Sequence, residues 1–65
     1  MIEIAQRVRE ARLAVQLSQS ELADRAEVSR PSVARVERGD DVNTATLGKI
    51  VTTLGLVLQV KDQAD

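Results

Sequence analysis

Along the first part of the chain, apolar residues recur every three or four positions, which is the period of an α-helix with one buried face. The first stripe predicts a helix from about Ile4 to Val15, with polar and charged residues around it. Its inward positions are Ile4, Val8, Ala11 and Val15. We therefore expect this helix to pack on the rest of the chain through that stripe.

Two shorter helices come next, separated by a tight turn. Ser18 and Glu21 have the spacing of a capping box, which predicts that a helix begins after Ser18. Ser29 has the position of a second N-cap, and Gly39 the position at which the second helix ends. The inward positions are Leu22, Ala23, Ala26, Val33 and Val36, with Val28 at the turn. The pattern predicts a helix-turn-helix whose second helix has a free outer side.

A fourth helix is expected from about Ala45 to Leu54, after the polar connection 40–44. Asn43 or Thr44 can cap its start, and Gly55 is expected to end it. Its inward positions are Leu47, Ile50, Val51 and Leu54.

The pattern changes after Gly55, because aliphatic and β-branched residues alternate with a period of two. Leu56, Leu58 and Val60 would share one face of a strand. A single strand leaves backbone groups unpaired, so its simplest partner is the same strand of a second copy. The alternative is an irregular apolar tail folded over the first helix. The expected fold class is therefore all-α, a bundle of about four helices with a short C-terminal β-strand that pairs across a dimer.

Composition excludes several classes of site. The chain has 65 residues with no Cys, His or aromatic residue, so zinc fingers, disulfide frameworks, histidine-based triads and aromatic base-stacking modules are excluded. No phosphate loop or activated nucleophile is recognisable, and we expect no catalytic residue, cofactor or metal. A single small domain near the lower limit of independent folding also favours a partner subunit. No apolar run has the length of a membrane span, and we expect a cytoplasmic protein.

Charge is unevenly distributed along the chain, although the net charge is only −1. Residues 7–38 hold seven arginines and five acidic residues, whereas residues 39–65 hold two lysines and four aspartates. The first part is therefore the one expected to face phosphate.

Three short motifs in the chain are specific enough to indicate a family. They are Ser-Gln-Ser-Glu-Leu-Ala at 18–23, Val-Ser-Arg at 28–30 and Val-Glu-Arg-Gly at 36–39. Together they resemble the Cro/phage-repressor (Xre) family of helix-turn-helix proteins, over roughly Ile4 to Leu54. The chain departs from that family at Gln16 and Glu27, which are frequent glycine sites. A non-glycine residue with positive φ at such a site costs on the order of 1 kcal/mol.

The resemblance implies a domain at 1–55 that binds double-stranded DNA, with the second helix of the motif in the major groove. Arginine can donate two hydrogen bonds to guanine O6 and N7. The implied base-reading residues are Arg30, Pro31 and Arg35, although Pro31 can also serve only as a rigid helix start. The implied backbone contacts are Gln19, Ser20, Ser29, Ser32 and Arg38, although Ser29 can serve only as a cap. Arg12 and Glu37 match an internal ion pair that ties the first helix to the third.

The ending Leu-Gly-Leu-x-Leu-x-Val with an acidic tip resembles HipB-like antitoxins. It implies that residues 56–65 form a dimerisation strand and tail, with Leu56, Leu58 and Val60 at the interface. The resemblance further implies a repressor of its own toxin–antitoxin operon, acting as a homodimer on a roughly palindromic operator and holding a HipA-like kinase toxin. The alternatives are a stand-alone phage or restriction-modification controller, and a protein–protein adaptor that no longer binds DNA.

Overall fold

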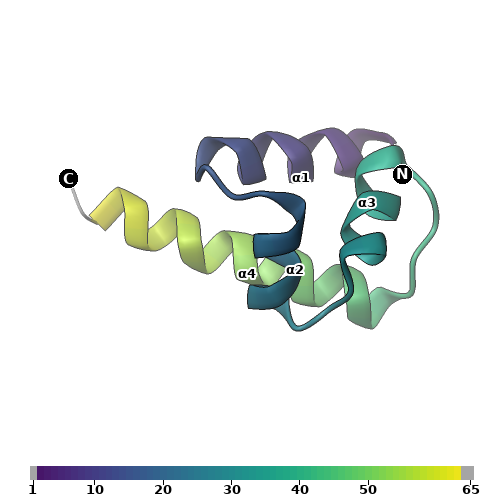
Figure 1. Ribbon diagram of the computed structural model, residues 1–65. Coiled ribbons are helices and arrows are strands. Elements are labelled where there is room, and N and C mark those ends of the chain that lie inside the picture. Colours follow the sequence, from purple (N-terminus) through teal and green to yellow (C-terminus); the bar gives the residue numbers. More distant parts are fainter. Residues whose placement is uncertain (1, 64–65) are drawn as a thin grey trace.

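Four helices make up the described part of the chain (Figure 1). The computed structural model describes the backbone of residues 2–63 and the side chains of residues 3–57. The helices are α1 (Ile2–Ala14), α2 (Gln19–Ala26), α3 (Arg30–Arg38) and α4 (Thr44–Gln63). The expected all-α bundle is confirmed for this part of the chain.

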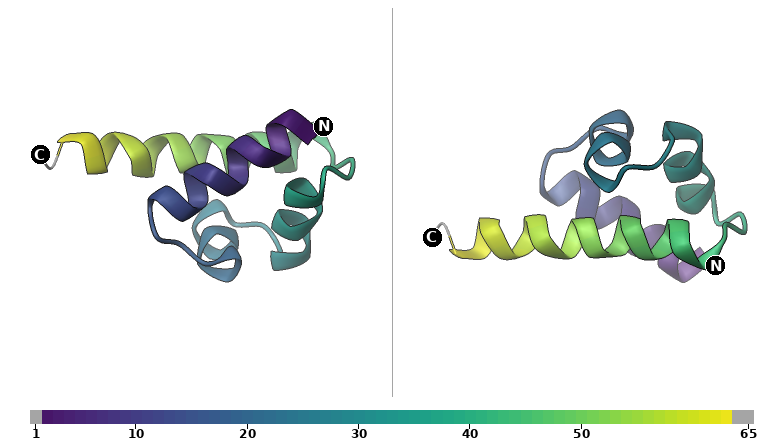
Figure 2. Two further views of the ribbon diagram at one scale, coloured as in Figure 1. Left: turned by 90° about the horizontal axis from the view of Figure 1, so that it is seen from above. Right: turned by 90° about the horizontal axis from the view of Figure 1, so that it is seen from below.

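The helix-turn-helix is carried on one side of the longest helix. Both views of Figure 2 show α2 and α3 on the same side of α4. α1 packs mainly on α3, and α2 packs on both α3 and α4. The C-terminal end of α4 extends past the other three helices (Figures 1 and 2).

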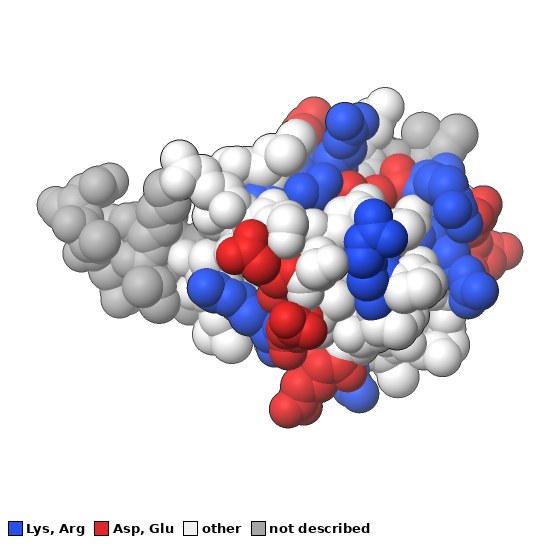
Figure 3. All heavy atoms as spheres, in the orientation of Figure 1, with Lys and Arg blue, Asp and Glu red and all other residues white. Residues whose placement is uncertain are grey.

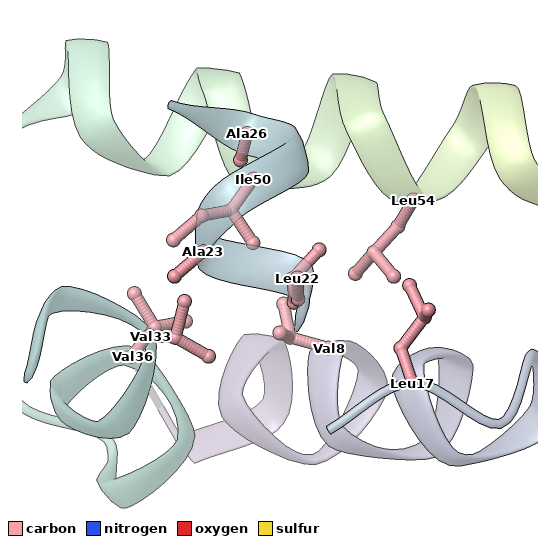
Figure 4. Packing of buried hydrophobic residues seen from close by; sticks show 9 residues of the cluster. All are labelled: Val8, Leu17, Leu22, Ala23, Ala26, Val33, Val36, Ile50 and Leu54. Atoms are coloured by element: carbon pink, nitrogen blue, oxygen red, sulfur yellow. The ribbon is translucent and has the colours of Figure 1, made fainter. Parts of the chain in front are cut away.

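The core is small and wholly aliphatic, and every helix contributes to it (Figure 4). Its largest fully buried side chains are Leu22, Ile50, Val33 and Val36. The other members of the buried cluster are Val8, Leu17, Ala23, Ala26 and Leu54. Because Val33 and Val36 lie in this core, the opposite side of α3 faces solvent.

Both short helices begin at the serine caps that the sequence predicts. The Ser18 hydroxyl accepts from the Glu21 N–H at 3.0 Å, and the Ser18 N–H donates to the Glu21 carboxylate at 2.9 Å. This backbone hydrogen bond lowers the pKa of Glu21 below its ordinary value. In α3 the Ser29 hydroxyl accepts from the Ser32 N–H, and Gly39 ends the helix with φ 85°.

Two turns contain a non-glycine residue in the left-handed region. Gln16 comes shortly after α1 with φ 60°, and Glu27 ends α2 with φ 58°. The turns are hydrogen-bonded: Leu17 N–H donates to the Arg12 carbonyl, and Val28 N–H donates to the Ala23 carbonyl. These hydrogen bonds hold a conformation that a side chain disfavours, so both turns store strain.

The expected inward stripes are wrong at Ile4 and Val51. Their side chains are 40% and 50% exposed. In α1 the buried positions are Ala5, Val8 and Arg12, so the buried side keeps Val8 but is rotated toward Ala5 and Arg12 relative to the expected stripe. Ile4 and Val51 both line a groove between α1 and α4.

The predicted C-terminal strand and the alternative irregular tail are both wrong, since residues 56–63 continue α4. Gly55 does not end the helix, and the expected boundary between 1–55 and 56–65 falls inside it. In a single chain a helix pairs its own backbone groups, whereas a lone strand leaves them unpaired. An interior glycine costs only about 1 kcal/mol. Leu56 is 59% exposed, and the side chains of Leu58 and Val60 lie outside the described residues.

Within the described residues, none of the helices has the length and apolar character needed to span a membrane.

The strain at Glu27 predicts the effect of a single substitution. Glu27→Gly should raise the free energy of unfolding by about 1 kcal/mol, because glycine adopts positive φ without a Cβ clash. In a domain of this size that corresponds to a rise in Tm of roughly 4–8 °C. The matched control is Gln6→Gly in the exposed middle of α1, which should lower stability by roughly 0.5–1 kcal/mol. Thermal unfolding of both variants checks the prediction, and a destabilised Glu27→Gly would contradict it.

Candidate nucleic-acid interface

The outer side of α3 presents the residues expected to read bases. Arg30, Pro31 and Arg35 are all exposed, while Val33 and Val36 on the other side are fully buried. The buried valines fix the rotation of the helix about its axis. The two arginines are therefore held on the outside by the core.

Arg30 and Arg35 are free to meet a ligand. Among the described residues neither has an ion pair, in contrast to Arg12 and Arg38, which pair with carboxylates. Five residues of helix separate Arg30 from Arg35 by about 7.5 Å along its axis. This is close to two base-pair steps of roughly 3.4 Å, so the two guanidinium groups can address positions about two base pairs apart on a duplex.

The serine and glutamine candidates lie at the N-termini of α2 and α3, where backbone N–H groups point outward. Ser20 is exposed, and Gln19 is half-buried. The Ser29 and Ser32 hydroxyls lie 2.8 Å apart, and Ser29 also caps α3. Both hydroxyls therefore have partners already, and Ser20 has the more accessible hydroxyl for a phosphate.

Arg38 has an acidic neighbour that the sequence interpretation did not give it. Its Nε and Nη2 donate to Asp40 Oδ2 at 3.2 and 3.0 Å, and both side chains are more than half exposed. An exposed pair of this kind contributes about 0–1 kcal/mol. Phosphate can therefore compete with Asp40 for Arg38 at small cost.

The structure brings Arg12 and Glu37 together, 25 positions apart in the chain. Arg12 Nε donates to Glu37 Oε2 at 2.7 Å, and Arg12 Nη2 donates to Glu37 Oε1 at 2.9 Å. Arg12 Nη1 donates to the Leu17 carbonyl at 2.9 Å. Arg12 is only 9% exposed, and its hydrogen bonds to Glu37 raise the pKa of the guanidinium. The pair joins α1 to α3, and Arg12 cannot turn outward without leaving the buried Glu37 carboxylate unpaired.

Gln19 belongs to the same network. Its Nε2 donates to Glu37 Oε1 at 3.4 Å, which is a long hydrogen bond. The first residue of α2 is thereby linked to the last turn of α3. A phosphate contact at Gln19 would be positioned relative to the outer side of α3 through this link.

Arg9 is a basic residue that the sequence interpretation did not assign to the site. It is exposed on α1 and lines an open hollow of about 350 Å³ together with Gln19 and Arg38. The buried Arg12–Glu37 pair forms the floor of that hollow. The sequence feature that could have identified Arg9 is its spacing from Arg12. Three residues of helix place Arg9 about one turn from the buried arginine, on the same side of α1.

Charge on this face follows the helices. In Figure 3 most basic side chains lie over α1 and α3, and acidic side chains gather over α2 beside a basic one, with further acidic side chains at the edge beyond α3. The acidic residues of α2 are Glu21 and Asp24, with Glu27 at its end. A polyanion is therefore attracted to α3 and to the N-terminal end of α2, and is repelled from the rest of α2.

No cluster of three or more acidic side chains suited to a metal ion occurs in the described part of the chain.

Residues 8–58 match the sequence model of the Helix-turn-helix family. The matched segment covers most of the chain and includes all of α2 and α3. Comparison with curated proteins and comparison with solved structures each gave no match.

The buried pair predicts a large loss of stability for one substitution. Arg12→Ala should lower the free energy of unfolding by about 3–5 kcal/mol, because Glu37 would be left buried without its partner. The control is Arg7→Ala, which removes an exposed pair with Glu3 at 3.4 Å and should cost no more than about 1 kcal/mol. Urea unfolding measures both. A fully stable Arg12→Ala protein that had lost only DNA binding would instead assign Arg12 to the interface.

Proposed function

We propose that this chain, which belongs to the Helix-turn-helix family, is a sequence-specific DNA-binding transcriptional repressor that places α3 in the major groove. Family membership supports a DNA-binding regulator. The observation that carries the specific proposal is the outward pair of arginines on α3, Arg30 and Arg35, held there by a buried opposite side.

The proposed reading mechanism is bidentate hydrogen bonding. Arg30 and Arg35 each donate to O6 and N7 of a guanine, which discriminates against another base by about 1–3 kcal/mol. Pro31 lies between them in the first turn, where its ring can contact a thymine methyl group. The operator half-site is therefore expected to contain two guanines.

The proposed backbone contacts come from the N-termini of the two short helices and from the end of α3. Gln19 and Ser20 receive one phosphate at the start of α2, and Ser29 and Ser32 receive another at the start of α3. Arg38 breaks its ion pair with Asp40 and binds a phosphate instead. Because these contacts include few full positive charges, affinity for non-specific DNA should be modest and should depend only moderately on salt.

We propose further that the repressor acts in the cytoplasm as a homodimer on a roughly palindromic operator. Two identical reading helices related by a two-fold axis bind half-sites about one helical turn apart. A domain with a core this small also gains stability from a partner subunit.

The finer proposal is an antitoxin that represses its own operon and holds a HipA-like kinase toxin. It is supported by the Leu-Gly-Leu-x-Leu-x-Val sequence from Leu54 to Val60, which resembles HipB-like antitoxins. A kinase-like gene next to this one, and co-purification of its product with the chain, would support the antitoxin role. A neighbouring methyltransferase gene would instead support a restriction-modification controller.

The reading role of α3 can be tested by selection of binding sites and by gel shift with the selected duplex. Arg30→Ala and Arg35→Ala should each weaken specific binding by about 1–3 kcal/mol and relax preference at one base position. Stability should change little, because both side chains are exposed.

The matched control is Arg25→Ala, which removes the same charge from the end of α2, beside α4. It should leave base preference unchanged. If both α3 variants keep the affinity and selectivity of the unaltered protein at one fixed salt concentration, the assigned reading surface is wrong. If the unaltered protein selects no duplex at all, the adaptor alternative is favoured.

A further inference from the structure

An apolar groove of about 440 Å³ runs between α1 and α4. Its apolar lining consists of Ile4, Val8, Ala11, Leu47, Val51 and Leu54. No residue of α2 or α3 lines it, so the groove does not belong to the DNA-binding surface. A ligand in the groove would leave α3 free.

Two of the large exposed apolar side chains lie in this groove, and a third follows it directly in the sequence. Ile4 and Val51 are 40% and 50% exposed within it, and Leu56 is 59% exposed just past Gly55. Apolar side chains grouped in this way on a small domain mark an interaction surface.

Besides its exposed apolar side chains, the groove contains a glycine, Gly55. It lies inside α4, lines the groove, and has no atom within 4 Å of the position that a Cβ would occupy. Glycine at an exposed helical position is unfavourable, since it loses more conformational freedom than other residues on folding. It does allow another helix to approach the backbone closely.

We propose that the groove binds a second copy of this chain, with the two α4 helices crossing antiparallel at Gly55 about a two-fold axis. This proposal assigns a contact surface to the homodimer that the proposed function requires. It rests on the proposed function only for the role of the dimer, which is to bind a paired site.

Self-complementarity favours a second copy as the occupant. Each chain supplies both a groove and a stretch of α4 that extends beyond its own domain (Figure 2). In a two-fold arrangement the extended part of each α4 lies in the groove of the other copy, which buries both features at once. Packing also supports this two-turn extension, because so short a helix is barely stable in water by itself.

Charge agrees with this occupant. At the N-terminal end of the groove, Arg7 is paired with Glu3. Two copies can therefore meet there without bringing unpaired like charges together.

The test is sedimentation of the full chain over a range of micromolar concentrations, without DNA. The unaltered protein should form dimers. Gly55→Ala should weaken association at least about tenfold, because the added methyl group separates the crossing helices. Its Tm at a concentration where the chain is monomeric should rise, because alanine favours helix and the site has open space.

The control is Thr52→Ala, at an exposed position of α4 that lines the hollow beside the end of α2 instead of the groove. It should raise Tm and leave the dimer intact. Val51→Lys gives a second, stronger disruption at a side chain that is already half exposed, and should yield monomer that remains helical by circular dichroism.

An unaltered chain that stays monomeric throughout would overturn the proposal, and so would a dimer that Gly55→Ala and Val51→Lys weaken no more than Thr52→Ala does. Failure of the proposed function is a separate result, because it is the absence of sequence-selective duplex binding. Val51→Lys should still bind an isolated half-site as the unaltered protein does, while losing the tighter binding to the paired site.

Discussion

The hydrogen-bonded pair of Arg12 and Glu37 is the interaction on which the geometry of this domain depends. The core contains no aromatic side chain, and small aliphatic residues alone can slide and repack with little loss of buried area. The pair is directional, and it links α1 to α3 and, through Gln19, to α2. All of its described donors and acceptors are paired, so the charge is buried without an unsatisfied group. The pair fixes how α3 is held against α1, while the buried Val33 and Val36 fix the rotation of α3 about its own axis.

The parts of the fold that could be predicted from sequence are those determined locally. Capping by Ser18 and Ser29 depends on residues within one turn, and both helices begin where these caps lie. The two glycines Gly39 and Gly55 show the limit of such reasoning. Gly39 adopts positive φ and ends α3, whereas Gly55 remains helical within α4. A glycine permits a helix to end, but the residues after it decide the outcome. Polar Asp40 and Asp41 come after the first glycine, and an aliphatic run comes after the second.

The candidate site also has parts that could be predicted from the sequence and parts that could not. The exposure of Arg30 and Arg35 results from helical periodicity, because Val33 and Val36 had to face inward. Contacts between distant segments cannot be obtained from periodicity. The pairing of residues 12 and 37 came only from a family resemblance, and the place of Arg9 beside the start of α2 depends on how α1 crosses the motif. The binding roles of these residues remain proposals.

The arrangement also resolves the apparent conflict between a net charge of −1 and a DNA-binding role. Electrostatic attraction over the whole molecule is weak, so a large non-specific term does not hide the contribution of a few base contacts. Specificity then depends on how rigidly those contacts are presented. A network that links three helices provides that rigidity, and the groove between α1 and α4 lies apart from it, lined by neither α2 nor α3. In the proposed dimer, association through the groove would therefore set the distance between the two proposed reading helices without altering how either one contacts DNA.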